Sequence, residues 1–115
     1  MYELSQQIIA YFTSKTAFTD IVSDNIYAVI APEGQTFPFA CFVINQQAIL
    51  SREGDEFNVT LFLWFSENQY DQAMQFTDTV TALVKENTSW NWEDSTFQFI
   101  EENISYCGII NFKKV

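Results

Sequence analysis

The nonapeptide FNVTLFLWF, residues 57–65, has the alternation of a β-strand that is buried on one face. Its odd-numbered positions are all apolar, whereas Asn58 and Thr60 between them are polar. Phe62 and Trp64 then occupy the second face, so the end of the strand is apolar on both sides. One face is therefore expected to pack on the domain's own core. The other needs a cover, either from this chain or from another molecule.

Apolar residues at helical spacing predict two amphipathic helices. The first spans residues 3 to about 14, and its apolar side comprises Leu4, Ile8, Tyr11 and Phe12. The second runs from about residue 69 to Glu86, and its apolar stripe comprises Ala73, Phe76, Thr77, Val80, Leu83 and Val84. Residues 17–25 form the predicted connector after the first helix, and a short helical turn within it is compatible with the sequence.

Four further strands are predicted around the central one, at residues 26–31, 39–50, 97–99 and 104–115. The last strand is expected to be broken or bulged near Cys107 and Gly108. The order of elements is then α-β-β-β-α-β-β. Hairpins with two helices on one face make an α+β two-layer sandwich with a mainly antiparallel sheet. A chain of 115 residues makes one domain, residues 1–115.

The hairpin formed by the second strand and the central strand is a candidate contact surface. Its first strand begins with the apolar run FACFVI and continues with the polar run NQQ, which includes Gln46 and Gln47. The base of the hairpin is therefore buried and a polar arm projects from it. The tip, residues 51–55, contains Arg52, Glu53 and Gly54, and glycine accepts the backbone conformation of a tight turn.

Residues 87–94 are predicted to form a loop that contains Trp90 and Trp92. These side chains either fold back over the sheet edge as core residues or form an exposed aromatic anchor for a partner. Phe62 and Trp64 pose a similar choice between the core and a partner. A sheet with helices on one side and apolar residues on both favours assembly into an oligomer.

Charge and hydropathy remove several classes of function. Fifteen acidic and five basic residues give a formal net charge of −10, which repels the phosphate backbone of nucleic acid. No apolar run approaches the roughly 20 residues of a membrane span. The start of the chain, MYELSQQIIAYF, lacks the basic region of a signal peptide. We therefore expect neither nucleic-acid binding, nor membrane insertion, nor export.

Residue types that catalysis commonly needs are missing. The chain has no histidine and only three, widely separated glycines, which excludes histidine-based triads, the common zinc ligand sets and a glycine-rich phosphate loop. The adjacent acidic pairs at 55–56, 93–94 and 101–102 are interpreted as solvated surface, because neighbours on a strand point to opposite faces. We predict that the protein is not an enzyme and has no cofactor and no bound metal.

The chain contains two cysteines, Cys41 and Cys107. Without an export signal both are expected to be reduced thiols. Cys41 lies in an apolar strand pattern, where cysteine acts as a small apolar residue. A disulfide between them would require the fold to bring them together.

The run IYAVIAPEGQTFPFACFVI, residues 26–44, resembles the signature stretch of tail completion (tail terminator) proteins of long-tailed phages and prophages. In that family an N-terminal helix precedes a short strand, a proline-containing loop and a strand that starts at a proline–aromatic pair. The rest of this chain is similar in order, with a long hairpin, an amphipathic helix and closing strands.

The resemblance implies a structural protein of the virion. Proteins of this family assemble as a hexameric ring on the last ring of the tail tube, stop its polymerisation and present a surface to the head–tail connector. The implied partners are further copies of this chain, the tail-tube protein and the connector protein. The implied location is the cytoplasm of the bacterial host during assembly, and the virion tail afterwards.

Carried onto this sequence, the resemblance implies contacts through the hairpin arm, the second sheet face and the tryptophan loop. The corresponding residues are Gln46, Gln47, Arg52, Glu53, Phe62, Trp64, Trp90 and Trp92. Two alternatives remain open from the residues themselves. One is another small head–tail or neck joining protein, and the other is a protein-interaction module unrelated to phages.

Overall fold

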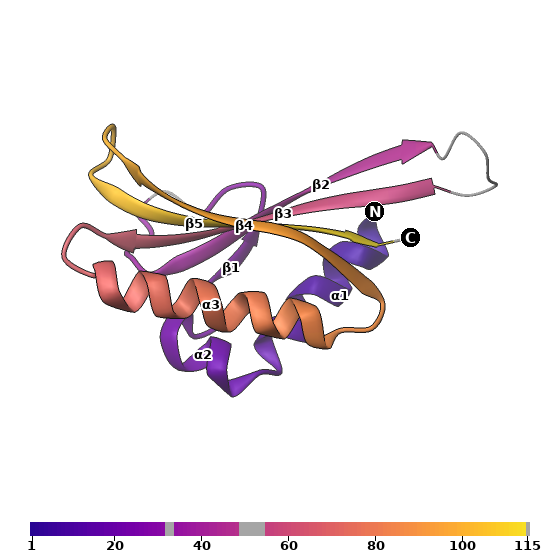
Figure 1. Ribbon diagram of the computed structural model, residues 1–115, viewed down its shortest axis with the longest axis horizontal. Helices are drawn as coiled ribbons and strands as arrows, with labels where there is room; N and C mark the ends of the chain where they lie inside the picture. Colours follow the sequence, from indigo (N-terminus) through magenta and orange to yellow (C-terminus); the bar gives the residue numbers. More distant parts are fainter. Residues whose placement is uncertain (32–33, 49–54, 115) are drawn as a thin grey trace.

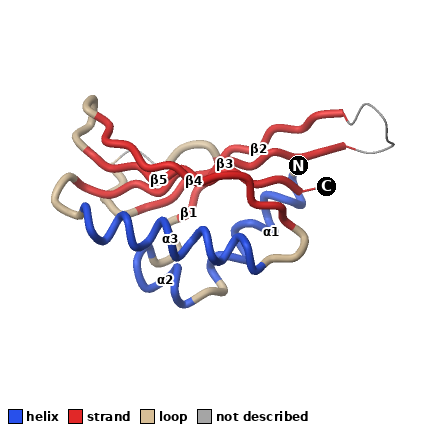
Figure 2. The backbone as a smooth tube through the Cα atoms, viewed as in Figure 1, coloured by secondary structure: helices blue, strands red, loops and turns tan. Residues whose placement is uncertain are grey.

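The computed structural model describes residues 1–31, 34–48 and 55–114. In this part of the chain, three helices lie on one face of a five-stranded sheet (Figures 1 and 2). The helices are α1 (Tyr2–Thr13), α2 (Thr16–Val22) and α3 (Tyr70–Glu86). The strands are β1 (Ile26–Ala28), β2 (Phe39–Ala48), β3 (Asp55–Ser66), β4 (Trp90–Ile100) and β5 (Ser105–Lys114). The predicted α+β two-layer sandwich is confirmed.

The strand predicted to be central, β3, lies in the middle of the sheet, whose order is β1-β2-β3-β5-β4. It pairs antiparallel with β2 on one side and with β5 on the other, and β4 pairs antiparallel with β5. Among the strands that the structure describes, only β1 and β2 run parallel to each other. The sheet is therefore mainly antiparallel, as predicted, and both backbone edges of β3 are hydrogen-bonded within the chain.

Both predicted helices have the apolar stripes expected from their spacing. Helix α1 buries Leu4, Ile8 and Phe12, which follow one another at intervals of four residues. Helix α3 buries all six residues of its predicted stripe, from Ala73 to Val84. The two helices are also joined by a hydrogen bond, in which the Tyr11 hydroxyl donates to the Leu83 carbonyl at 2.6 Å.

Helix α2 lies in the segment predicted as a connector, so the observed element order is α-α-β-β-β-α-β-β. It has seven residues and no side-chain cap, which makes it too short to be stable by itself. Its stability comes from packing instead, because Phe18 and Val22 are buried. The Phe18 ring lies 5.1 Å from that of Phe12 and 5.5 Å from that of Phe76, so α2 fills the space between α1 and α3.

Two predictions about the last strands were wrong. The segment expected to be a loop up to residue 94 is a strand from Trp90 onwards, because β4 pairs with β5 from Trp90 to Ile100. The bulge lies in β4, between Trp92 and Asp94, and not near Cys107. Strand β5 keeps an unbroken register with β3, because it is held by partners on both sides.

Gly108 allows close packing between β5 and α3 and is not part of a bulge. A Cβ atom at this position would overlap the Thr77 hydroxyl on α3. That hydroxyl donates a hydrogen bond of 2.8 Å to the Ala73 carbonyl in the preceding turn of the helix. Helix α3 therefore approaches the backbone of β5 closely at Gly108.

Replacing Gly108 with alanine is expected to lower the free energy of unfolding by about 1–3 kcal/mol, because the new methyl group overlaps Thr77. Urea denaturation measures this change. The double variant Gly108→Ala/Thr77→Ala should recover part of the loss, since it removes the overlapping hydroxyl and methyl groups. If the double variant loses as much unfolding free energy as the two single variants added together, the result would contradict a direct contact between the two residues.

Candidate interaction surface

The three helices cover one face of β3 and leave the other without a helical layer (Figure 1). Four of the odd-numbered side chains are buried in the core: Val59, Leu61, Leu63 and Phe65. Phe62 and Trp64 lie on the opposite face and are half-buried. We call this second side of the sheet the open face, comprising the outward side chains of β2, β3, β5 and β4.

Strand register assembles an apolar half of the open face from three strands. One row across the sheet is Cys41, Phe62 and Ile109, and the next is Phe39, Trp64 and Cys107. The rings of Phe37, Phe39 and Trp64 are stacked in sequence, with centroids 5.5 and 6.4 Å apart. The two aromatic residues of the prediction are therefore part of a larger apolar surface.

The described residues of the segment between β1 and β2 lie against part of this surface. Together they form a groove of about 360 Å³, with Val29, Ile30 and Ala31 on one side. Phe39, Phe62 and Trp64 line it from the sheet, and Asn103 closes it from the turn between β4 and β5. The groove is a concave, mainly apolar feature of the size that accepts a large side chain of a partner.

Two aliphatic residues at the rim of the groove are strongly exposed, Val29 by 69% and Ile30 by 78%. Val29 also has a positive φ of 71°, which is strained for a β-branched residue. Its amide donates a hydrogen bond of 2.7 Å to the Phe42 carbonyl, which holds the residue in this conformation. Strain of this kind is found preferentially at functional sites.

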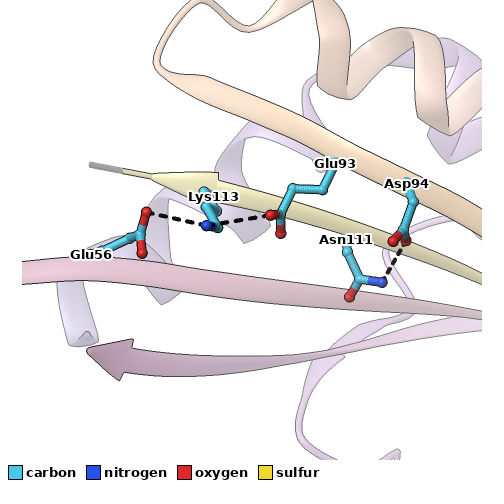
Figure 3. A network of polar contacts seen from close by, with 5 residues as sticks. All are labelled: Glu56, Glu93, Asp94, Asn111 and Lys113. Carbon is cyan, nitrogen blue, oxygen red and sulfur yellow. Dashed lines mark hydrogen bonds and ion pairs between the residues drawn. The ribbon is translucent and has the colours of Figure 1, made fainter. Parts of the chain in front are cut away.

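The other half of the open face is polar and is cross-linked between strands (Figure 3). The Thr60 hydroxyl donates to the Asn111 side-chain oxygen, and the Asn111 amide donates to Asp94, both at 2.7 Å. Lys113 lies 3.4 Å from each of two carboxylates, Glu56 and Glu93. The negative charge of Glu56, and to a smaller extent that of Glu93, raises the pKa of Lys113. Among the described residues of this half, Lys113 thus pairs with two carboxylates, and Asp94 adds a third that is paired with Asn111.

The two cysteines lie on the open face on strands that flank β3, and both are free thiols. Burial raises the pKa of the Cys41 thiol, and it raises the pKa of Cys107 from 9.0 to about 12. Both groups are therefore protonated and weakly nucleophilic at neutral pH. Cys41 acts as a small apolar residue, as predicted.

The hairpin arm extends beyond the layer of helices (Figure 1). Gln46 lies on β2 opposite Phe57 and is exposed, and the backbone of Gln47 pairs with that of Glu56. The predicted tip with Arg52 and Glu53 lies outside the described residues. The arm is thus a strand pair as far as the structure describes it.

The two tryptophans near the start of β4 differ in burial. Trp90 is 5% exposed and packs on Phe112 and Tyr11, with ring centroids 4.5 and 4.8 Å away. It is a core residue, so its prediction as a surface contact was wrong and the core alternative holds. Trp92 is 37% exposed, and its indole donates to the Ser95 hydroxyl at 3.0 Å beneath the Lys85 ammonium.

Sequence reasoning missed several residues of this surface, namely Val29, Ile30 and Phe39 in the groove and Ile109 beside Phe62 on β5. Ile109 lies beside Phe62 because of the register between β3 and β5, which the sequence pattern does not reveal. A signal was present for Phe39, because the run FACFVI is apolar on both faces, like the end of the central strand.

Among the described residues, no group of three or more His, Cys, Asp and Glu side chains could hold a metal ion. Within the same residues, no helix is long and apolar enough to cross a membrane. No protein-family model matches this chain, and no curated protein matches it in sequence. The resemblance of residues 26–44 to tail terminator proteins therefore rests on the sequence pattern.

The raised pKa of Cys107 predicts a loss of stability at alkaline pH. Because the folded protein holds this proton more tightly than the unfolded chain, the stabilisation is complete below about pH 9 and is lost as the pH rises towards 12. Above about pH 9, the free energy of unfolding of the wild type should fall more steeply than that of Cys107→Ala, by up to about 1.4 kcal/mol per pH unit. Denaturation series across this range measure both slopes, and parallel slopes would contradict the prediction.

Proposed function

We propose that this protein is a non-catalytic structural component of a long-tailed phage or prophage that caps the tail tube. It forms a ring on the last ring of the tube, stops further polymerisation and provides the joining surface for the head–tail connector. Its assembly takes place in the cytoplasm of the bacterial host, and the finished ring is part of the virion tail.

The observation that carries this proposal is the open face of the sheet. A single layer of helices leaves Phe62 and Trp64 half-buried beside an apolar groove, with Val29 and Ile30 exposed at its rim. Contiguous apolar surface of this kind is a feature of protein interfaces. The resemblance to tail terminator proteins suggests a neighbouring copy of the chain as the partner that covers the open face.

The order of elements supports the same family. The resemblance predicts an N-terminal helix, a short strand, a loop, a long hairpin, an amphipathic helix and closing strands. The described residues contain these elements in this order, with α2 as an addition after α1. The long β2–β3 hairpin, which includes Gln46 and Gln47, extends beyond the helices and has the reach to contact a neighbouring subunit or the tube (Figure 1).

The charge of the chain supports assembly on a template. A net charge of −10 on each subunit opposes association of free copies and keeps an apolar surface soluble. The tube end would then supply the additional contacts that overcome this repulsion. We therefore expect the protein to form rings more readily with tail-tube protein than by itself.

Trp64→Ser is the variant that tests the open face. We expect it to fold, and to weaken ring formation on purified tail-tube protein from the same genome by at least about tenfold, because it removes a large aromatic contact from the interface. Sedimentation velocity and electron microscopy of the mixtures measure assembly, and thermal unfolding measures the fold. Tyr2→Ser, at an exposed aromatic residue on α1, is the matched control and should assemble normally.

Three results would count against the proposal. If Trp64→Ser unfolds the protein, Trp64 belongs to the core and the interface lies elsewhere. If the wild type stays monomeric at high concentration and does not bind the tail-tube protein, the tail terminator assignment fails. A gene neighbourhood of metabolic enzymes, without portal, capsid or tail-tube genes, would also contradict it.

A further inference from the structure

A second exposed surface lies at the end of the molecule where α3 begins and β4 turns into β5. Four aromatic rings contact one another there, and we call them the aromatic cluster: Tyr70, Phe97, Phe99 and Tyr106. The rings of Phe97 and Tyr106 stack at 5.5 Å, and Tyr70 meets both of them edge-on, at 5.7 and 5.4 Å. The Phe99 ring lies 5.3 Å from that of Tyr106.

The cluster lies on the helical side of the sheet and is separate from the open face. Register places Phe97 opposite Gly108, the residue that α3 approaches through Thr77. Helix α3 starts at Tyr70, and the rings of the cluster are at the limit of its cover. Tyr70 and Phe99 are each 49% exposed, so two aromatic rings of the cluster are accessible to a partner.

The charged residues adjacent to the cluster in the chain are acidic. Glu67 and Asp71 flank Tyr70, while Glu101 and Glu102 follow β4, and all four side chains are exposed. Exposed aromatic rings with carboxylates next to them in the chain favour a cationic partner, because the ring faces and the carboxylates both attract positive charge.

The four lysines of the described residues lie away from this surface. Lys85 is near the end of α3 opposite to Tyr70, and its ammonium lies 4.3 Å from the centre of the Trp92 ring. Lys15 lies 4.8 Å from the centre of the Tyr11 ring. Lys113 and Lys114 are at the end of β5 opposite to Tyr106. The chain thus places lysines on two of its other aromatic rings, and none of these four cations reaches the cluster.

We propose that the aromatic cluster binds arginine or lysine side chains from a basic segment of another protein. The cation lies over the exposed rings of Tyr70 and Phe99, and the surrounding carboxylates supply the long-range attraction. The contact combines cation–π interaction with charge complementarity, and neither requires the open face. Binding at the aromatic cluster is therefore independent of ring formation through the open face.

A second copy of this chain is a poor occupant of the cluster. Three of its described lysines are already engaged, two on aromatic rings and Lys113 between two carboxylates. Each copy also has a net charge of −10, which opposes contact through an acidic surface. A heterologous protein with a basic surface satisfies the charges of the cluster.

A titration of the isotope-labelled protein with an arginine-rich peptide tests the proposal. The control peptide has every arginine replaced by citrulline, which keeps the shape of the side chain and removes its charge. Amide signals of residues 67–71, 97–100 and 106 should shift with the arginine peptide, and the citrulline peptide should bind at least about tenfold more weakly. Equal binding of both peptides would overturn the proposal, and so would shifts centred on Phe62 and Trp64.

Variants separate the rings from general charge attraction. Phe99→Leu and Tyr70→Leu should each weaken binding by about fivefold, whereas Tyr2→Leu, at an exposed tyrosine on α1, should not. Thermal unfolding checks that each variant folds. If Tyr70→Leu does not fold, Phe99→Leu and the charge variants still test whether the cluster binds the peptide.

The matched charge variants are Glu101→Lys/Glu102→Lys and Glu3→Lys/Asp20→Lys, which change the net charge equally on different surfaces. The first pair should weaken binding by at least about fivefold more than the second, because only the first lies beside the cluster. Equal losses would show non-specific attraction and overturn the proposal. Self-association that Phe99→Leu abolishes would identify a second copy as the occupant instead.

Discussion

A β-strand presents alternate residues to opposite faces, and in β3 this constraint decides which surface of the protein is free. Hydrogen bonds to β2 and β5 hold the strand from both sides, so it cannot rotate to bury its second face. The odd-numbered side chains pack under α1, α2 and α3, and no helix of the described residues covers the even-numbered ones (Figure 1). Phe62 and Trp64 stay half-buried for this reason, although the strand is among the most apolar segments of the chain.

The open face that results has two halves with different physical properties. The apolar half around the groove stabilises a contact by removing hydrocarbon from water, which is non-directional. The polar half, cross-linked through Asn111 and Lys113, contributes specific hydrogen bonds and charges (Figure 3). An apolar area beside a polar one is the usual anatomy of a protein interface, in which the first supplies affinity and the second selects the partner.

The position of the few cations shapes the rest of the surface. Lys15 and Lys85 lie over the aromatic rings of Tyr11 and Trp92, and Lys113 lies between two carboxylates. These pairings leave a strongly acidic exterior, to which the exposed rings of the aromatic cluster add apolar area. Repulsion between such surfaces opposes association of identical copies and favours contact with a basic partner. The open face and the aromatic cluster therefore offer surfaces of different chemistry, one mainly apolar and the other aromatic and acidic.

Local periodicity alone determined the central strand, the apolar stripes of α1 and α3 and the two-faced character of Phe62 and Trp64. These features depend on neighbours in the chain, which a pattern of period two or 3.6 records directly. Helix α2, the start of β4 at Trp90 and the position of the bulge followed only from the tertiary structure. Phe18 and Trp90 are ordered by rings from distant segments, and strand register brings Ile109 and Cys107 beside β3. Long-range contacts of this kind leave no periodic trace in the sequence, so only the folded chain could place them.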